Sequence, residues 1–204
     1  MTKNISNIRT DYSKSILNKS DVDPNPIAQF KSWFSKVLNT NVYEPNAMVL
    51  STVNANGEPN GRVVLLKQIT DVGFVFFTNY LSTKGKELQE NPHASLTFFW
   101  PELEQQIRVS GIVEKISVEE SKEYFNSRPR ESQIAAIASK QSEELQSRVE
   151  LSNSFLQIER EFVGKNLKTR EMKAIVLFLF VLCQLSSVEI LRLLRIFLWA
   201  RKYK

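Results

Sequence analysis

The spacing of apolar residues changes from a helical to a strand period early in the chain. From Ile27 to Leu38 apolar residues recur every three or four positions, after a boundary at 23–26, and this predicts a helix. After Ala47 the apolar residues recur with a period close to two, and turn residues interrupt this alternation. It predicts an antiparallel meander of three strands, at 47–54, 61–69 and 74–78.

The next segment adds one short helix and two strands. Ser82 is placed to cap a helix that continues to about Glu90. Apolar and aromatic residues then predict strands at 94–100 and 105–115, with a turn between them. These segments bring the number of predicted strands to five or six.

The remaining regular part is predicted to be helical. Ser117 and Glu120 have the spacing of a capping box, which predicts a helix to about Asn126, and Pro129 must interrupt it. Two more helices are expected, at about 130–138 and 143–162. Five or six strands with helices around them predict the α+β class and a small antiparallel β-barrel.

The end of the chain differs from the rest. Fifteen residues from Ala174 to Val188 carry no charge, and basic residues are mixed with apolar ones after them. Three interpretations stay open: a packed strand or helix, an amphipathic or anchoring segment shorter than the roughly 18 residues of a spanning helix, or the product of a shifted reading frame. We therefore divide the chain into a domain at 1–165 and an atypical hydrophobic and basic segment at 166–204.

The composition is that of a globular protein, with 42% hydrophobic and 24% charged residues. A net charge of +5 permits contact with nucleic acid or a membrane surface, but it also suits small ligands such as phosphate esters.

A single cysteine excludes an intramolecular disulfide, and the polar N-terminus has no signal-peptide core, so we expect a cytoplasmic protein. One histidine and one cysteine make no zinc cluster, and no glycine-rich phosphate loop of a common pattern is present. Any redox reaction would therefore have to be carried out by a cofactor.

Two cations at the ends of one predicted strand are the first candidate ligands for phosphate. Because side chains alternate along a strand, Arg62 and Lys67 point to opposite faces. One phosphate cannot easily use both, so each cation is expected to serve a different anionic group. The alternative is that the two charges only solvate the ends of a buried strand.

Later segments add further candidates. Ser82-Thr83-Lys84 opens a helix, where backbone N–H groups, a hydroxyl and a lysine converge on an anion. The segment 127–132 places two guanidinium groups and two hydroxyls around another helix start, although a capped and solvated turn explains it equally well. Gln106, on a strand among apolar residues, needs partners that a heterocycle rich in donors and acceptors would supply.

Taken in order, these segments resemble the pyridoxamine 5'-phosphate oxidase family. The resemblance rests on Arg62 to Lys67, Phe77-Thr78-Asn79, Ser82-Thr83-Lys84, Gln106, residues 124–133 and residues 139–142, and it runs from about Ile8 to about Gly164. It implies an FMN-binding split barrel and a homodimer that holds FMN at the subunit interface, with no role for nucleic acid or a metal.

The resemblance also implies roles for individual residues. The cofactor residues would be Arg62 and Lys84 at the FMN phosphate, Phe77, Thr78, Gln141 and Ser142 as further contacts, and Gln106 with the run Val63, Val64, Leu65, Leu66 and Lys67 near the flavin ring. The substrate phosphate would be held by Lys67, Tyr124, Arg128 and Ser132, under a segment that contains Arg9 and Tyr12. No side chain is assigned as the catalytic acid or base, because positioning of the two rings would do most of the work.

The implied reaction takes pyridoxamine or pyridoxine 5'-phosphate to pyridoxal 5'-phosphate. Hydride passes from the exocyclic carbon to the flavin, and oxygen reoxidises the flavin to give hydrogen peroxide. Three departures from the family pattern are visible. Thr83 stands where relatives often carry arginine and Phe77 where tyrosine is common, and both predict weaker FMN binding without its loss. No family motif is recognisable after Gly164, so the C-terminal residues that would complete the site are missing. The alternative is a module that binds FMN or pyridoxal phosphate without turnover, and a membrane-surface protein that uses the basic tail ranks last.

Overall fold

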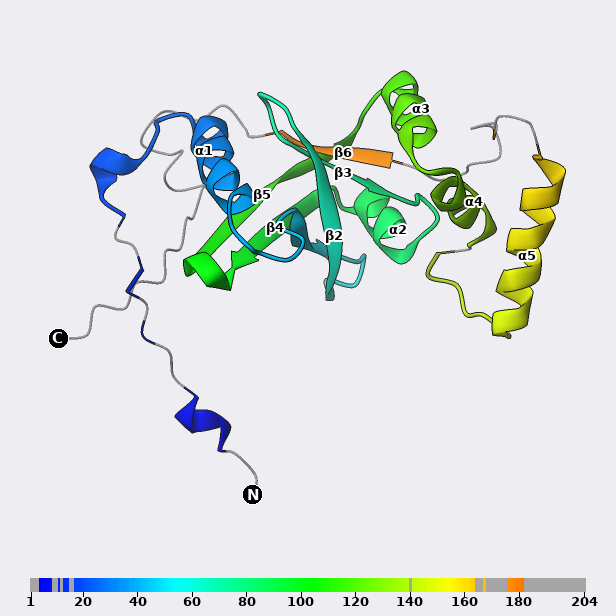
Figure 1. Cartoon of the computed structure of the whole chain (residues 1–204), viewed down its shortest axis with the longest axis horizontal. Helices are drawn as coiled ribbons and strands as arrows, with labels where there is room; N and C mark the ends of the chain where they lie inside the picture. The colour runs from blue at the N-terminus through cyan, green and yellow to red at the C-terminus, as the bar shows by residue number, and fades with distance from the viewer. Residues whose placement is uncertain are drawn as a thin grey trace.

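The computed structural model describes residues 4–8, 11, 13–14, 17–139, 141–163, 167 and 176–181. These residues form a closed antiparallel β-barrel with helices at its ends (Figure 1). The strands are β1 (Ala47–Val53), β2 (Pro59–Ile69), β3 (Phe74–Thr78), β4 (His93–Trp100), β5 (Gln105–Lys115) and β6 (Val176–Val181), in the order β1-β2-β3-β6-β5-β4. The α+β class and the antiparallel barrel that the sequence predicts are confirmed.

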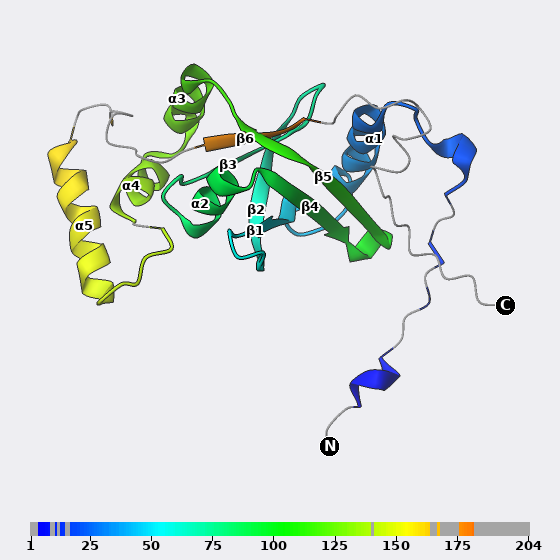
Figure 2. The ribbon, with the colours of Figure 1, turned by 180° about the vertical axis from the view of Figure 1, so that it is seen from behind.

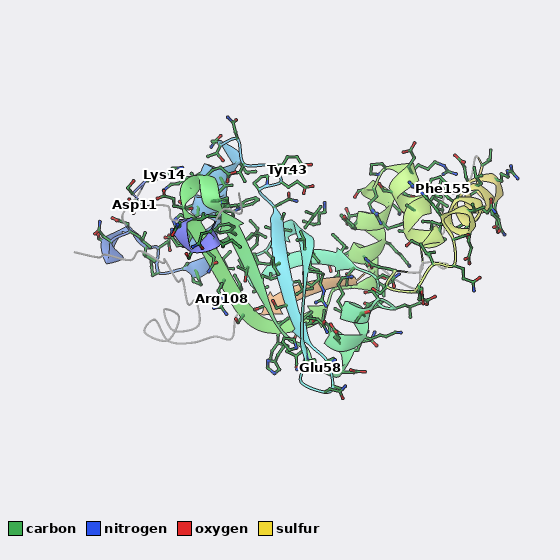
Figure 3. The ribbon with its side chains drawn as sticks, turned by 90° about the horizontal axis from the view of Figure 1, so that it is seen from below. Asp11, Lys14, Tyr43, Glu58, Arg108 and Phe155 are labelled. Atoms are coloured by element: carbon green, nitrogen blue, oxygen red, sulfur yellow. The ribbon has the colours of Figure 1, made fainter. Side chains whose placement is uncertain are left out.

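The β1–β2 hairpin is fixed by its turn. The side-chain oxygen of Asn54 accepts hydrogen bonds from the backbone N–H groups of Asn56 and Glu58, at 3.0 and 2.9 Å. Gly57 has a φ of +83°, a left-handed conformation that favours glycine. The turn sets the register in which Leu50 lies opposite Arg62, and Figure 3 shows Glu58 at the tip of the hairpin.

Helix α1 (Pro26–Leu38) packs into the barrel core. Asn25 caps it by accepting hydrogen bonds from the N–H groups of Ile27 and Ala28. The buried ring of Phe30 lies edge-on to Phe74, with 4.6 Å between the ring centroids. The predicted helix is therefore confirmed, and it joins the inner faces of the strands in one hydrophobic cluster.

A second, smaller cluster holds the helices that follow β5. Its buried residues are Phe125, Ile134, Phe162 and Leu167. They belong to or adjoin α3 (Val118–Ser127), α4 (Arg130–Ala138) and α5 (Arg148–Glu161), which lie at one end of the barrel in both views (Figures 1 and 2). Both hydrogen bonds of the predicted capping box at Ser117 and Glu120 are present.

The predicted start of the last helix is wrong by five residues. Helix α5 begins at Arg148, because the Ser147 side chain accepts a hydrogen bond from the N–H of Glu150 and so caps the helix there. Residues 143–147 contain good helix formers, and this composition, without the cap, favoured the longer helix.

The C-terminal segment supplies a barrel strand. Strand β6 pairs with β3 through Phe76 and Phe178 and with β5 through Val113 and Phe180. The packed-strand interpretation therefore describes 176–181, and most of 166–204 lies outside the described residues, as do Arg9 and Tyr12. In the part of the chain that the structure describes, no helix is long and apolar enough to cross a bilayer.

Candidate functional site

Strand β2 turns Arg62 toward the inside of the barrel and Lys67 toward solvent. Arg62 is half-buried, while Lys67 is exposed near an irregularity in the β2–β3 register at Leu66. The Nη1 of Arg62 donates to the Thr52 hydroxyl at 2.5 Å and to the Leu50 carbonyl at 3.4 Å. The opposite orientation of the two cations, predicted from strand alternation, agrees with this burial.

A buried carboxylate completes the surroundings of Arg62. Glu87, on α2 (Thr83–Glu90), is 3% exposed, and its Oε2 lies 3.1 Å from Nη2 of Arg62. It also accepts hydrogen bonds from the Thr52 hydroxyl at 2.5 Å and from the Asn60 amide at 2.6 Å. Residues 52, 60, 62 and 87 therefore form one hydrogen-bonded network, buried at Thr52 and Glu87, that joins β1, β2 and α2.

Lys84 is the second cation near this network. It is 8% exposed, and its ammonium donates to the Ser82 hydroxyl at 3.3 Å. Burial lowers the pKa of Lys84 below its ordinary value of 10.5, the positive charge of Arg62 lowers it further, and Glu87 opposes the shift. The ion pairs of the described residues are Lys31 with Asp71 and Arg62 with Glu87, so no carboxylate there pairs with Lys84. A buried ammonium in this state favours an anionic ligand.

The start of α2 is held close to the loop before it. Ser82 caps the helix by accepting a hydrogen bond from the N–H of Gly85. A Cβ at position 85 would lie 2.5 Å from the backbone oxygen of Asn79, so only glycine fits this approach. The tight packing fixes the backbone of Lys84 next to the end of β3.

A cleft of about 330 Å³ lies between the end of β3 and the helices α3 and α4. It is lined by Phe77, Thr78, Asn79, Tyr124, Arg128, Ala135, Ala136, Ser139 and Gln141. The hydroxyl of Thr78 is buried and has no hydrogen-bond partner among the described residues. An unpaired buried hydroxyl that lines a cleft suits a polar ligand.

Tyr124 and Arg128 both reach this cleft because the chain turns after α3. Arg128 has extended backbone angles, φ −74° and ψ 147°, as expected before a proline. Burial raises the pKa of Tyr124, and the nearby Arg128 charge partly opposes the shift. Phe77 stacks on the Tyr124 ring with an interplanar angle of 4°, so the phenylalanine has a packing partner.

The structure divides the sequence-predicted residues among three places. Phe77, Thr78, Tyr124, Arg128 and Gln141 line the cleft, whereas Arg62 belongs to the network inside the barrel and Lys84 lies near that network at the start of α2. Lys67 and Gln106 alternate with buried residues on the outside of the barrel, Gln106 opposite the exposed Phe99. Ser132 and Ser142, which has a φ of 68°, do not line the cleft.

The segment before α1 contacts the β4–β5 turn. The N–H of Lys14 donates to the Glu104 carboxylate at 2.9 Å, and its ammonium donates to the Glu102 carbonyl at 2.6 Å. The predicted covering residues Arg9 and Tyr12 lie outside the described residues. The contact therefore places only the neighbouring Lys14, beside the strand that carries Gln106.

Three polar residues of the network were missed by sequence reasoning: Thr52, Asn60 and Glu87. A signal existed for Thr52, because it follows Met48 and Leu50 at two-residue spacing and so continues the buried face of β1. Glu87 lies three residues after Lys84 on a helix, a spacing that brings side chains to one face.

A family model and individual relatives among known proteins point to the same family. The family model described as "Pyridoxamine 5'-phosphate oxidase" matches residues 34–160. The pyridoxine/pyridoxamine 5'-phosphate oxidase of Janthinobacterium sp. is 47% identical over 158 residues, which are 78% of this chain and 75% of the relative.

Solved structures agree on the fold. The structure of PhzG from Burkholderia lata, in complex with tetrahydrophenazine-1-carboxylic acid, is similar with a TM-score of 0.76 and 28% identity, over 83% of each chain. A pyridoxamine 5'-phosphate oxidase-related, FMN binding protein from Nostoc punctiforme has a TM-score of 0.57 at 16% identity, covers 76% of this chain and 80% of its own, and supports the fold alone.

Proposed function

Because the chain belongs to the pyridoxamine 5'-phosphate oxidase family, we propose that it binds FMN and oxidises pyridoxamine or pyridoxine 5'-phosphate to pyridoxal 5'-phosphate with oxygen. The observation that carries the proposal is the buried Lys84 ammonium, which lies near Arg62 and has a neutral hydroxyl as its hydrogen-bond partner. Such a pair of cations suits a phosphate dianion.

The chain's residues would divide the binding of two phosphates. Arg62 and Lys84 would hold the FMN phosphate, and Tyr124 and Arg128, which share the cleft, would hold the phosphate of the B6 vitamer with Lys67 and Ser132. Further FMN contacts would come from Thr78, Gln141 and Ser142, from Gln106 and from the main chain of residues 63–66. When bound, FMN would accept hydride from the substrate and pass the electrons to oxygen.

The B6 vitamers are favoured over a larger ring system by the degree of similarity. The Janthinobacterium oxidase is 47% identical to this chain, against 28% for PhzG. The protein's contribution would be to fix both phosphates and to hold the two rings at reacting distance, so that a bimolecular hydride transfer becomes effectively unimolecular.

An absorbance spectrum and a peroxide assay test this function. Purified protein, reconstituted with FMN if necessary, is expected to show bound flavin and to produce hydrogen peroxide from pyridoxine 5'-phosphate or pyridoxamine 5'-phosphate. Riboflavin in place of FMN is the matched control, since it lacks the phosphate. Protein that cannot take up FMN would refute the proposal, and bound flavin without peroxide would favour the non-catalytic binding module.

We also propose that the protein is a homodimer. The outer face of the barrel exposes Val49 at 40%, Val63 at 66% and Phe99 at 61%, and Val49 lies opposite Val63 in the β1–β2 pair. Lys67 lies on the outside of β2, the strand that carries Val63. Gln106 lies on the outside of β5, directly opposite Phe99 of β4. A second copy on this face would cover the apolar side chains and bring its own residues to the site.

Replacing Val63 with aspartate is expected to convert the dimer to a monomer, because a charge would be buried against an apolar partner face. Sedimentation velocity measures the mass, and FMN titration measures the accompanying loss of flavin binding. Val72→Asp is the control, because Val72 is 54% exposed in the β2–β3 turn. A wild-type monomer that binds FMN fully would contradict the proposed dimer.

A further inference from the structure

The buried carboxylate of Glu87 is arranged to hold Arg62, and it does not line the cleft. Its Oε2 accepts from both Thr52 and Arg62, while its Oε1 accepts from Asn60. Thr52 is fully buried and links the same two residues, because its oxygen accepts from Arg62 and its hydroxyl hydrogen is donated to Glu87. Glu87 on α2 and Thr52 on β1 therefore both accept hydrogen bonds from the guanidinium of Arg62.

These contacts occupy some of the N–H donors of the guanidinium and leave the others available. Nη1 donates to Leu50 and Thr52, which accounts for both of its hydrogens, and Nη2 donates one hydrogen to Glu87. Nε and the second hydrogen of Nη2 have no partner among the described residues. Arg62 thus keeps two donors for a ligand while its orientation is fixed by three hydrogen bonds.

The same carboxylate couples Arg62 to the helix that carries Lys84. Arg62 and Lys84 are like charges close enough for Arg62 to oppose protonation of Lys84, and Glu87 counters this repulsion. Glu87 lies one helical turn after Lys84, so its bonds to β1 and β2 also fix where α2 starts. The network sets the relative positions of two cations that come from different elements.

We propose that Thr52 and Glu87 are positioning residues for Arg62, which they hold in the orientation that binds the phosphate of FMN, without touching the cofactor themselves. The inference rests on the proposed FMN function. Holding a long side chain in its binding conformation before the ligand arrives removes the ordering cost from the binding step. The benefit should appear only for ligands that carry the phosphate.

Thr52→Val is the sharpest test, because it removes two hydrogen bonds of the network and leaves every charge in place. Glu87 substitutions alter charge and position together. The dissociation constant for FMN is expected to rise on the order of tenfold, while that for riboflavin stays within about twofold, as measured by flavin fluorescence titration. Thr52→Ser keeps the hydroxyl and is expected to restore FMN affinity.

The matched control is Thr40→Val, which also removes a threonine hydrogen bond, from Thr40 to the Val37 carbonyl at the end of α1. It is expected to lower thermal stability without changing the ratio of the two flavin affinities. A double-mutant cycle with Arg62→Lys asks whether Thr52 acts through Arg62, and Thr52→Val is then expected to change FMN affinity by less than about twofold in the Arg62→Lys protein.

The outcomes separate the inference from the function on which it rests. Wild-type protein that does not bind FMN overturns both. Wild-type protein that binds FMN, with an unchanged FMN-to-riboflavin ratio in Thr52→Val, overturns the positioning role alone, as does equal weakening of both flavins. If Thr52→Val does not fold, Asn60→Ala removes another of the three donors to Glu87, from a half-buried strand position, and the ratio of the FMN and riboflavin affinities again decides.

Discussion

Replacing Lys84 with methionine will weaken FMN binding about a hundredfold and will raise the thermal stability of the FMN-free protein. The affinity loss follows because a charge-assisted contact to phosphate contributes about 1.5–3 kcal/mol. The stability gain follows because Lys84 is 8% exposed and its ammonium has a hydroxyl as its partner, so an apolar side chain of similar length fits the site better. Calorimetry of the apoprotein and FMN titration measure the two effects.

The stability difference has a defined pH dependence. Because the folded-state pKa of Lys84 lies below 10.5, the unfolded chain holds more protons between the two pKa values, and the stability of the wild-type apoprotein rises with pH in that window. Below the folded pKa the cost of the buried charge is fully present. The advantage of Lys84→Met is therefore expected to be largest near neutral pH and to shrink as the pH approaches 10.5.

Lys86→Met is the control for this substitution, because Lys86 is exposed on the same helix. It is expected to leave FMN affinity and its pH profile unchanged. Equal melting temperatures of the wild type and Lys84→Met near neutral pH, or a difference that does not shrink toward pH 10.5, would contradict the argument, since they would mean that the pKa of Lys84 is not lowered by its burial.

Replacing Glu87 with alanine will lower the free energy of unfolding by about 3 kcal/mol, because removal of one partner leaves the half-buried Arg62 without its counter-charge. Thr52 and Asn60 also lose the acceptor for their hydrogen bonds. Urea denaturation of the apoprotein measures the change. The stability that is lost comes from the contacts that join α2 to β1 and β2.

Glu58→Ala is the matched control for Glu87→Ala. Glu58 is an exposed carboxylate at the hairpin tip that accepts a hydrogen bond from the Asn54 amide at 2.7 Å, and its removal is expected to cost about 0.5 kcal/mol or less. If both substitutions cost the same, the buried network around Glu87 does not contribute to stability as its geometry indicates.

Local signals in the sequence predicted the elements well where the cause of an element is local. The boundary between α3 and α4 follows from Pro129, and the start of α3 follows from the Ser117 capping box. The start of α5 was wrong because two kinds of local signal compete, helix-forming composition from Glu143 and the cap at Ser147. The identity of β6 stayed open because pairing with β3 and β5 is not a local property.

The candidate site, like the fold, was predictable from the sequence only where its cause is local. Strand alternation sufficed to place Arg62 and Lys67 on opposite faces, and the ordered motifs sufficed to gather Tyr124 and Arg128 at one cleft. The partnership of Arg62 with Glu87 joins residues 25 positions apart on different elements, so no periodicity reports it. Networks of this kind become visible only after the elements have been packed together.

Closure of the barrel by β6 has a consequence for the order of folding. The pairs Phe76 with Phe178 and Val113 with Phe180 join residues far apart in the sequence, and β6 is the last strand that the structure describes. Until the ribosome has released that strand, β3 and β5 are open edges with unpaired backbone groups. We expect barrel closure to be the slow step, and these two edges to be the surfaces through which nascent chains associate wrongly.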